Sequence, residues 1–356
     1  MVMGFGAPAF CANPDPAPGV PYLVSLSCLV AIPRSAIARK GLSYMTRMIP
    51  AALGAVMLMA LGLIAPANAQ SRVFVAALGS DTNACTFAAP CRSFQHAHNV
   101  VAANGEIDVL DPAGYGALTI TKAISVQGHG FSGITATSGN AITINAGAND
   151  QISLRGLVIE GFGTGDNGIV FNAGTSLNIQ DSVIRHFTAN GISFQPTAGA
   201  SELNVSQTLV SDLGSTATAV LMEPHFPGSV KSVLDHVRLA HGGQGLVLVT
   251  GFSGTLHTVT IADSVVSDYG NTGIDISASA GDAQVMVRNC TVSNNGTGIE
   301  IDFSSSNTRV TKSTITGNGT GLNTQTSGGG GLFSYGDNNL DGNTINGTFT
   351  STIAYH

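Results

Sequence analysis

Leu154-Arg155-Gly156-Leu157-Val158-Ile159 and Ile179-Gln180-Asp181-Ser182-Val183-Ile184 are two copies of one short pattern. In each copy an apolar residue is followed by a mostly small residue three positions later and by an aliphatic residue five positions later. Eight copies recur at intervals of 23 to 29 residues, and the fourth residues of the copies, the anchors, are Leu157, Ser182, Thr208, Val237, Ser264, Cys290, Ser313 and Asn338. A period of this length predicts a solenoid, in which one structural unit stacks on the next.

A second pattern follows six of the eight anchors by about ten residues, a Gly and then alternating apolar residues, as in Gly273-Ile274-Asp275-Ile276 and Gly298-Ile299-Glu300-Ile301. Alternation with period two, bounded by Gly, Asn, Asp and Ser, predicts short strands joined by tight turns. Repeats of this length that contain only strands are typical of a right-handed parallel β-helix. The predicted fold class is therefore all-β, a single-stranded right-handed parallel β-helix of about nine coils.

The N-terminal part differs from the repeats in composition. Residues 45–69 begin with Met45-Thr46-Arg47, continue with an apolar run and end in Ala67-Asn68-Ala69, which predicts a secretory signal peptide. Residues 1–44 are then an upstream extension or a misassigned start. The remaining chain divides into an N-terminal cap with the first strands (71–123), the β-helix (124–343) and a C-terminal cap (344–356). We expect a secreted or periplasmic protein without a membrane span in the mature chain.

The charge of the mature chain restricts its partners. After Ala69, 10 Lys and Arg residues face 20 Asp and Glu residues, so the net charge is near −10. Such a surface repels phosphate backbones and argues against nucleic-acid binding. It also argues against a polyanionic ligand, unless charges are locally arranged or a cation bridges them.

The cysteines are few. Cys85 and Cys91 lie six positions apart, and in an oxidising compartment we expect them to form a disulfide, with two free thiols as the alternative. Cys290 is an anchor whose equivalents are Ser264 and Ser313, which predicts a buried small residue.

Two stretches near the start of the mature chain read Gly79-Ser80-Asp81-Thr82-Asn83-Ala84-Cys85-Thr86-Phe87-Ala88-Ala89-Pro90-Cys91-Arg92-Ser93-Phe94 and Gly105-Glu106-Ile107-Asp108-Val109-Leu110-Asp111-Pro112. Together they resemble the entry segment of secreted bacterial right-handed parallel β-helix repeat proteins of the pectate-lyase-like group. The resemblance covers about residues 71–350. It implies a short N-terminal capping helix over 93–103, with Phe94, Ala97 and Val101 turned inward. The same architecture carries lyases, hydrolases, epimerases and adhesins, so the resemblance does not assign an activity.

Stacked coils allow the outward and inward columns to be read from the anchors. Two positions after the anchor the column is aliphatic throughout and predicts the core. Four positions after the anchor it contains His186, Asp212, His241 and Asp268 in successive coils, where a spacing of about 5 Å would place imidazoles beside carboxylates. These four are the candidate catalytic residues, able in principle to supply an acid and a base or to hold a metal. The alternative is a solvated row of turns.

A second candidate site lies on the outer face of the strands that follow. Glu223, Asp275, Glu300, Asp302 and Asn323 form a carboxylate and amide patch, a candidate binding surface. Neighbouring carboxylates repel one another unless one is protonated or a cation lies between them, so calcium is conceivable, although no cofactor is required. The alternative is an ordinary solvated sheet face. Five positions after the anchor, Asn295, Asn318 and Asn343 predict a structural Asn ladder.

No complete catalytic motif is present, so whether the protein is an enzyme stays open. Gly128-His129-Gly130 resembles a tripeptide of polygalacturonases, but the acidic motifs that accompany it there are missing, and we interpret it as a turn.

The first hypothesis is a noncatalytic protein that binds carbohydrate or a cell surface. The alternatives are a polysaccharide-active lyase, hydrolase or epimerase, and a structural or adhesive spacer. Exposed aromatic residues in a groove would favour sugar binding, and the candidates are Phe162, Phe187 and Tyr269.

Overall fold

A computed structural model describes residues 70–354 except 198, 226–227, 303–305 and 326–329. All of these belong to one compact unit, Asn68–His356. The predicted signal peptide (45–69) and the upstream stretch (1–44) lie outside the described residues, as do the last two residues of the predicted C-terminal cap.

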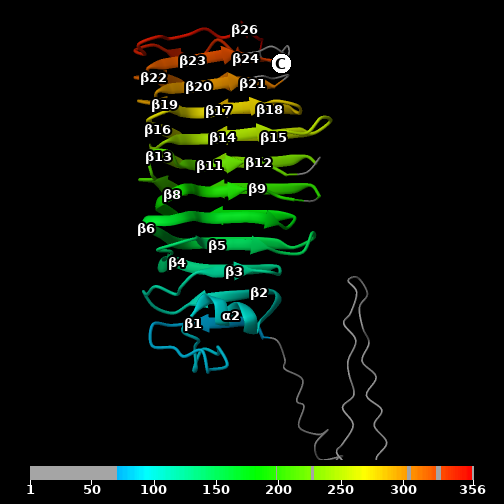
Figure 1. The fold of residues 1–356 in the computed structure, drawn as a ribbon, viewed down its shortest axis with the longest axis vertical. Coiled ribbons are helices and arrows are strands. Elements are labelled where there is room, and N and C mark those ends of the chain that lie inside the picture. The colour runs from blue at the N-terminus through cyan, green and yellow to red at the C-terminus, as the bar shows by residue number, and fades with distance from the viewer. Residues whose placement is uncertain (1–69, 198, 226–227, 303–305, 326–329, 355–356) are drawn as a thin grey trace, which may run out of the picture. The chain divides into compact units, whose positions relative to one another are not determined.

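Each coil of the solenoid contributes strands to three parallel sheets, face 1, face 2 and face 3, and the coils stack from the N-terminal to the C-terminal end (Figure 1). Face 1 contains β7 (Ser176–Gln180), β9 (Ser201–Ser206), β12 (Val230–Asp235), β15 (Leu256–Ala262), β18 (Asp282–Arg288), β21 (Asn307–Thr311) and β24 (Gly331–Ser334). Face 2 contains β10 (Leu209–Ser211), β13 (Arg238–Gly242), β16 (Val265–Tyr269), β19 (Thr291–Ser293), β22 (Thr314–Thr316) and β25 (Asn339–Leu340). Face 3 contains β3 (Leu118–Ile120), β5 (Asn140–Asn145), β11 (Thr218–Met222), β14 (Gln244–Thr250), β17 (Thr272–Ala278), β20 (Thr297–Asp302) and β23 (Thr320–Gln325).

Longer strands in the first coils turn from one face to the next. β6 (Gln151–Ala173) crosses all three faces, β8 (Val183–Phe194) crosses faces 2 and 3, and β4 (Ile124–Thr135) crosses faces 1 and 2. β1 (Gln70–Val75) and β2 (Val101–Val109) begin face 1. The structure confirms the predicted all-β parallel β-helix, and its number of coils, about eight, is close to the predicted nine.

The core consists of the predicted columns. The column two positions after each anchor is in register from coil to coil and fully buried up to the last coil, with members Ile159, Ile184, Val210, Leu239, Val266, Val292 and Ile315. The anchors from Leu157 to Ser313 are buried too, and hydroxyls among them supply acceptors that the backbone lacks: Ser264 Oγ accepts the N–H of Val237 at 3.1 Å, and Ser313 Oγ accepts that of Cys290 at 3.1 Å. Cys290 is a free, buried thiol, as predicted.

Two corners frame face 2, and at most coils each turns on one residue with left-handed backbone geometry. Corner 1, between faces 1 and 2, has Asp181, Gln207, His236, Asp263, Asn289 and Lys312 at φ of 48° to 52°. Corner 2, between faces 2 and 3, has His186, Asp212, His241, Asp268 and Asn294 at φ of 53° to 65°. Asn, Asp and His tolerate this geometry better than other residues with a side chain. The His and Asp column of the sequence is therefore first of all a column of corner residues.

The predicted Asn ladder stabilises corner 2 in the last coils. Asn318 Oδ1 accepts the backbone N–H of Asn295 at 2.9 Å, and Asn343 Oδ1 accepts that of Asn318 at 3.0 Å. The Asn318 amide group donates to the carbonyl of Val292 at 3.1 Å. Asn295 and Asn318 are buried, so these bonds satisfy backbone groups that water does not reach.

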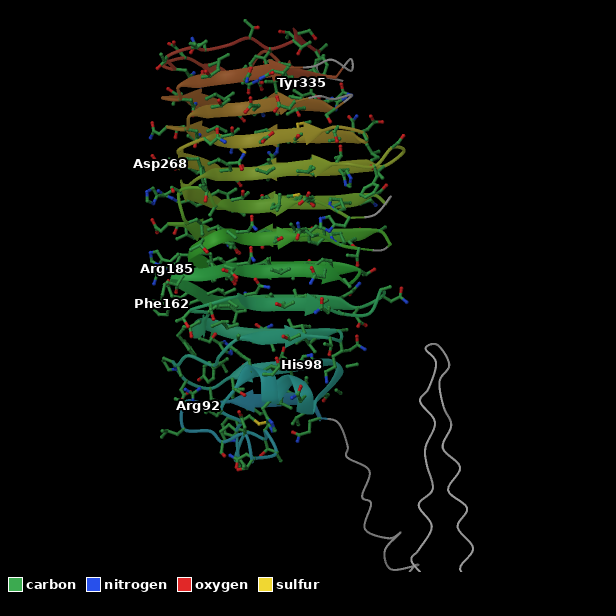
Figure 2. All side chains as sticks on the ribbon, viewed as in Figure 1. Arg92, His98, Phe162, Arg185, Asp268 and Tyr335 are labelled. Atoms are coloured by element: carbon green, nitrogen blue, oxygen red, sulfur yellow. A yellow bond between two sulfur atoms is a disulfide. The ribbon has the colours of Figure 1, made fainter. Side chains whose placement is uncertain are left out.

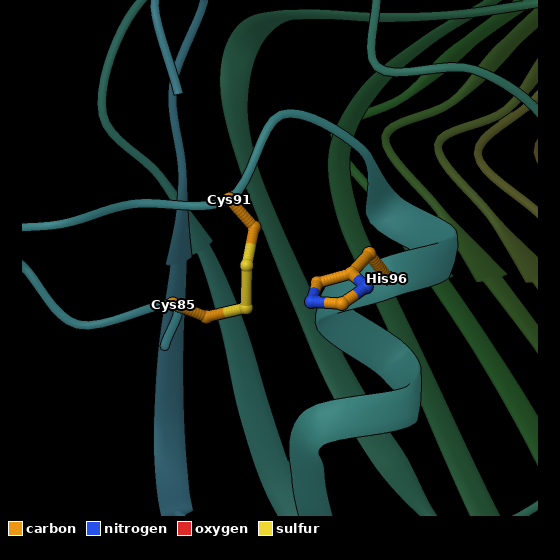
Figure 3. Close-up of side chains that lie close together, drawn as sticks. All are labelled: Cys85, Cys91 and His96. Carbon is orange, nitrogen blue, oxygen red and sulfur yellow. A yellow bond between two sulfur atoms is a disulfide. The ribbon is translucent and has the colours of Figure 1, made fainter. Parts of the chain in front are cut away.

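The N-terminal end is covered by α2 (Phe94–Val100), which is shorter than the predicted helix over 93–103 because Val101 already begins β2. Ser93 caps the helix by accepting the N–H of His96 at 3.2 Å, and Phe94, Ala97 and Val101 are buried as predicted. Cys85 and Cys91 form the predicted disulfide, beside His96 of the helix (Figure 3). At the other end β26 (Ser351–Thr352) pairs with β24.

Candidate functional site

Two insertions interrupt the solenoid on successive corners, one on either side of face 2. At corner 1, Gln127 lies opposite Arg155 and Ser132 opposite Leu157, so four residues, 128–131, stand against the single Gly156. At corner 2, Glu160 lies opposite Arg185 and Gly165 opposite Phe187, so residues 161–164 stand against the single His186. In solenoids, such extra residues project from the surface and often form the binding face.

Glycines fix both insertions where the chain passes close to the next coil. A Cβ on Gly128 would lie 2.4 Å from the carbonyl oxygen of Gly156, and a Cβ on Gly161 would lie 2.4 Å from that of His186. No other residue fits such an approach. The glycine that opens each insertion is thus required by the local backbone.

Each insertion displays an aromatic ring. Phe131 is 41% exposed and Phe162 is 62% exposed, whereas Phe187 and Tyr269, the other two aromatic candidates from the sequence, are buried. Phe162 has a φ of +53°, a conformation that is rare for a bulky residue and is found mainly where the surroundings impose it. The corner therefore holds Phe162 away from the core, where Phe187 packs.

A cavity of about 480 Å³ lies between the two rings on face 2. Phe131 and Phe162 line it together with Val158, Glu160 and Arg185 of the sheet and with the loop 112–114. We call this cavity the aromatic cleft. It combines apolar walls with a charged floor.

Glu160 organises the floor of the aromatic cleft. One carboxylate oxygen accepts the backbone N–H of Phe162 at 3.0 Å and lies 2.7 Å from Nδ1 of His186. The other accepts Nε of Arg185 at 2.7 Å. Burial alone would raise the pKa of Glu160, but the hydrogen bonds from Phe162, His186 and Arg185 outweigh it and lower the pKa. Glu160 is therefore a charged residue that holds the Phe162 insertion and Arg185 in place.

His129 stands next to the aromatic cleft on the corner 1 insertion. Its Nε2 lies 2.6 Å from Oδ1 of Asp108, a buried carboxylate that also binds Arg72 at 3.0 Å. Its ring stacks on Phe131 with centroids 5.8 Å apart. A separate polar cavity of about 460 Å³ opens on the other side, lined by His129 and Arg155. The Gly128-His129-Gly130 turn is thus not only a turn, because it orients an imidazole that lines this polar cavity and stacks on a ring of the aromatic cleft.

The predicted row of His186, Asp212, His241 and Asp268 is aligned on corner 2, but it does not form one network. His241 Nδ1 lies 3.2 Å from Asp212 Oδ1, whereas His186 contacts Glu160 instead of Asp212. Asp268 accepts the side-chain amide of Asn294 at 3.3 Å. The prediction of alternating imidazole and carboxylate contacts is therefore wrong except for the Asp212–His241 pair. Figure 2 places Phe162, Arg185 and Asp268 along one edge of the solenoid, in that order towards the C-terminal coils.

Asp212, His241 and Asp268 nevertheless share a cavity. It measures about 530 Å³ and is also lined by Leu209, Ser211, Arg238 and Ala240 of face 2. We call it the corner cavity. It lies on the same face as the aromatic cleft and on the following coils.

The predicted carboxylate patch lies on face 3, away from both of these cavities. Asp275 and Glu300 are neighbours in register, and the Asn323 amide donates to Glu300. Asp302 lies in the next outward row of face 3, where its register partner is Ser277, which in turn pairs with Val249. Glu223 directly follows Met222, the register partner of Leu248, so two strands separate Glu223 from Asp302. Burial, together with the charges of Glu300 and Asp302, raises the pKa of Asp275 to about 6.

Two groups of described residues bring three metal-ligating atoms within 4.8 Å of one another, and neither includes the carboxylate patch. One group is Cys85, Cys91 and His96. Its two sulfur atoms are joined to each other in the Cys85–Cys91 disulfide. The other is Asp235, His236 and Asp263, a partly exposed group in which Arg288 and Asn289 already bind the Asp263 carboxylate.

Sequence reasoning missed the residues that form the aromatic cleft, apart from Phe162. A signal was present, because Glu160 and Arg185 occupy the same position, three after the anchor, in successive coils. Opposite charges at equivalent positions of stacked strands predict a contact. The paired glycines around His129 and Phe162 were the signal for the insertions.

Comparison with known proteins agrees with this fold. Residues 230–356 match the family model for the right handed beta helix region. A crystal structure of pectate lyase Pel9A is similar, with a TM-score of 0.59 at 14% sequence identity over 80% of this chain and 78% of that one. No curated protein matches the sequence. Within the described part of the chain, no helix has the length and apolar character needed to cross a membrane. The chain is thus a right-handed parallel β-helix with a pectate-lyase-like fold.

Proposed function

We propose that the protein binds carbohydrate through the aromatic cleft without cleaving it. The observation that carries the proposal is the pair of exposed rings, Phe131 and Phe162, on two insertions that flank a polar floor. A sugar ring presents C–H bonds on its faces and hydroxyl groups around its edge. Apolar rings cover the first, and groups such as Arg185 and Glu160 can bond the second.

The state of Glu160 supports binding rather than cleavage. A carboxyl group that acts as a general acid has a raised pKa, so that it carries a proton near neutral pH. Glu160 has a lowered pKa and three hydrogen-bond donors around its two oxygens. It is suited to positioning Phe162 and Arg185, not to donating a proton to a glycosidic bond.

Affinity electrophoresis and calorimetry on a panel of bacterial and plant polysaccharides test the proposal. We expect at least one glycan to bind, and Phe162→Ala and Phe131→Ala each to weaken that binding by about tenfold, the equivalent of 1.4 kcal/mol. The matched control is Phe252→Ala, an exposed ring on the loop between β14 and β15. Absence of binding to every glycan, or equal binding by all three variants, would contradict the proposal.

An enzymatic function is the second candidate, and the Asp108–His129 pair favours it. A histidine held by a buried carboxylate is the usual arrangement of a general base, and here it faces a polar cavity that contains Arg155. The same mixtures are assayed for new reducing ends and unsaturated uronates. If the protein cleaves a glycan, and if both His129→Ala and Asp108→Asn abolish this cleavage, the function is catalysis and not binding alone.

We also propose that the protein works outside the cytoplasm. The Cys85–Cys91 disulfide supports this, because such bonds persist mainly in oxidising compartments. Cell fractionation and the mass of the mature N-terminus test it, with cleavage after Ala69 as the expected result.

A further inference from the structure

We propose that the aromatic cleft and the corner cavity are two ends of one track on face 2, occupied by a single linear, uncharged glycan that runs parallel to the solenoid axis. This inference rests on the proposed function and adds to it the direction, length and charge class of the ligand. It is drawn from the register of the strands and from the side chains that face outward from them.

Two outward rows connect the cavities. The first is aliphatic and consists of Val158, Val183 and Leu209, each paired in register with the next. The second runs beside it, two residues further along each strand, and is polar or small, with members Thr135, Glu160, Arg185, Ser211 and Ala240. Face 2 thus offers an apolar lane for the C–H face of a sugar chain and a polar lane for its hydroxyl groups.

The rows leave no coil between the two cavities. Arg185 lines the aromatic cleft and is the direct register partner of Ser211, which lines the corner cavity. Neighbouring strands lie about 4.8 Å apart, so the rise from Thr135 to Ala240, which spans four strand spacings, is about 19 Å. That distance exceeds a single sugar unit and corresponds to a short oligosaccharide.

Small side chains give the track its depth in the corner cavity. Ser211 and Ala240 form part of its lining, with Arg238 on the side of corner 1 and Asp212 and His241 on the side of corner 2. The side chains of Asp212 and His241 are 50% and 71% exposed, so hydrogen-bonding groups on both sides are accessible to a ligand.

The charges along the track favour a neutral ligand. Arg185 and Arg238 are balanced by Glu160, Asp212 and Asp268, and the chain as a whole is acidic. A polyanionic glycan would meet as much repulsion as attraction here, whereas hydroxyl groups can bond to either charge.

The test is calorimetry of the full chain with neutral oligosaccharides from disaccharide to heptasaccharide, prepared from the glycan that binds best. We expect affinity to rise with length until the ligand spans both cavities and then to level off. The double variant Asp212→Gly/His241→Gly should weaken binding of the longest ligand by about tenfold and leave the disaccharide unchanged. Glycine suits these left-handed positions, as Gly317 and Gly342 show in the same column.

The matched control is His236→Gly/Asp263→Gly, which removes an imidazole and a carboxylate from left-handed positions of corner 1. It should bind every ligand normally. If affinity does not depend on length, or if the Asp212→Gly/His241→Gly variant binds the heptasaccharide normally, the track is wrong while the aromatic cleft stands. If neither an oligosaccharide nor a polysaccharide binds, both the track and the proposed carbohydrate-binding function are wrong.

Discussion

The carboxylate of Glu160 fixes the backbone of Phe162, whose N–H donates to Oε1 at 3.0 Å. The bond spans only two positions at the start of the insertion, where Phe162 itself has a left-handed φ of +53°. The same carboxylate binds Arg185 and His186 from the next coil. One side chain therefore couples an exposed aromatic ring to two coils of the solenoid.

Replacing this carboxylate should affect both stability and binding. We expect Glu160→Gln to lower the free energy of unfolding by about 1–3 kcal/mol, because Arg185 and His186 lose a charged acceptor at a largely buried position. Glycan affinity should fall as Phe162 becomes less constrained. Thermal unfolding and calorimetry measure the two effects. Glu202→Gln, an exposed change on face 1, is the control, and equal behaviour of the two variants would contradict the role given to Glu160.

Asp275 should make stability depend on pH. Its pKa is raised to about 6 in the folded protein, so between about pH 4 and pH 6 the folded state keeps a proton that the unfolded chain has released. Stability from this group is present below about pH 4 and is lost as the pH rises through about 6. We expect Asp275→Asn to be more stable than the parent at pH 8, by roughly 1–2 kcal/mol, and equal to it at pH 4. Unfolding midpoints across this range provide the measurement, and parallel pH profiles of the two proteins would show that Asp275 does not titrate as described.

The Asn ladder should be sensitive at its centre. Asn318→Ala removes the acceptor for the backbone N–H of Asn295 and the donor to the carbonyl of Val292, both out of contact with water. A buried group left without a partner costs about 1–3 kcal/mol, so we expect a loss in that range or above it. Asn339→Ala, at an exposed position of β25, should change the unfolding temperature little. A similar loss in both variants would mean that the ladder contributes nothing particular.

The disulfide should stabilise the N-terminal cap. Cys85 and Cys91 are separated by six positions, and closing so short a loop is worth about 2 kcal/mol in the chain-entropy model. Changing both residues to Ser should therefore weaken the cap and expose β1 to protease before the later coils. Limited proteolysis followed by mass spectrometry reports the order of cleavage. Cleavage of the double variant at the rate of the parent would show that helix α2 holds the cap by itself.

The sequence was sufficient for the coil and its core, because the aliphatic column recurs in every repeat and must face inward if coils are to stack. Ile184 and Val292 could be placed from spacing alone, and so could the Asn295–Asn318 ladder. Corner geometry was harder to foresee. The alternation of His186, Asp212, His241 and Asp268 suggested chemistry, yet these residue types share a tolerance for left-handed backbone that a turn also requires.

The aromatic cleft could not be predicted in full because it depends on insertions that leave the repeat length almost unchanged. Residues 161–164 stand against one residue in the next coil, so three residues are added there, and loops elsewhere in the coil absorb the difference. Spacing between anchors therefore gives no warning. The register of Gly165 with Phe187 shows that Phe162 has left the column that it shares in sequence with Phe187 and Tyr269.

The single left-handed residue at most corners has a wider consequence for how this surface can change. A coil that turns on one residue keeps its core positions fixed whatever is placed at the bend, as the insertions at 128–131 and 161–164 show. Apart from Glu160, which serves both, recognition and stability can therefore change separately in this protein, and new loops can be grafted at one bend after another while the interior remains as it is.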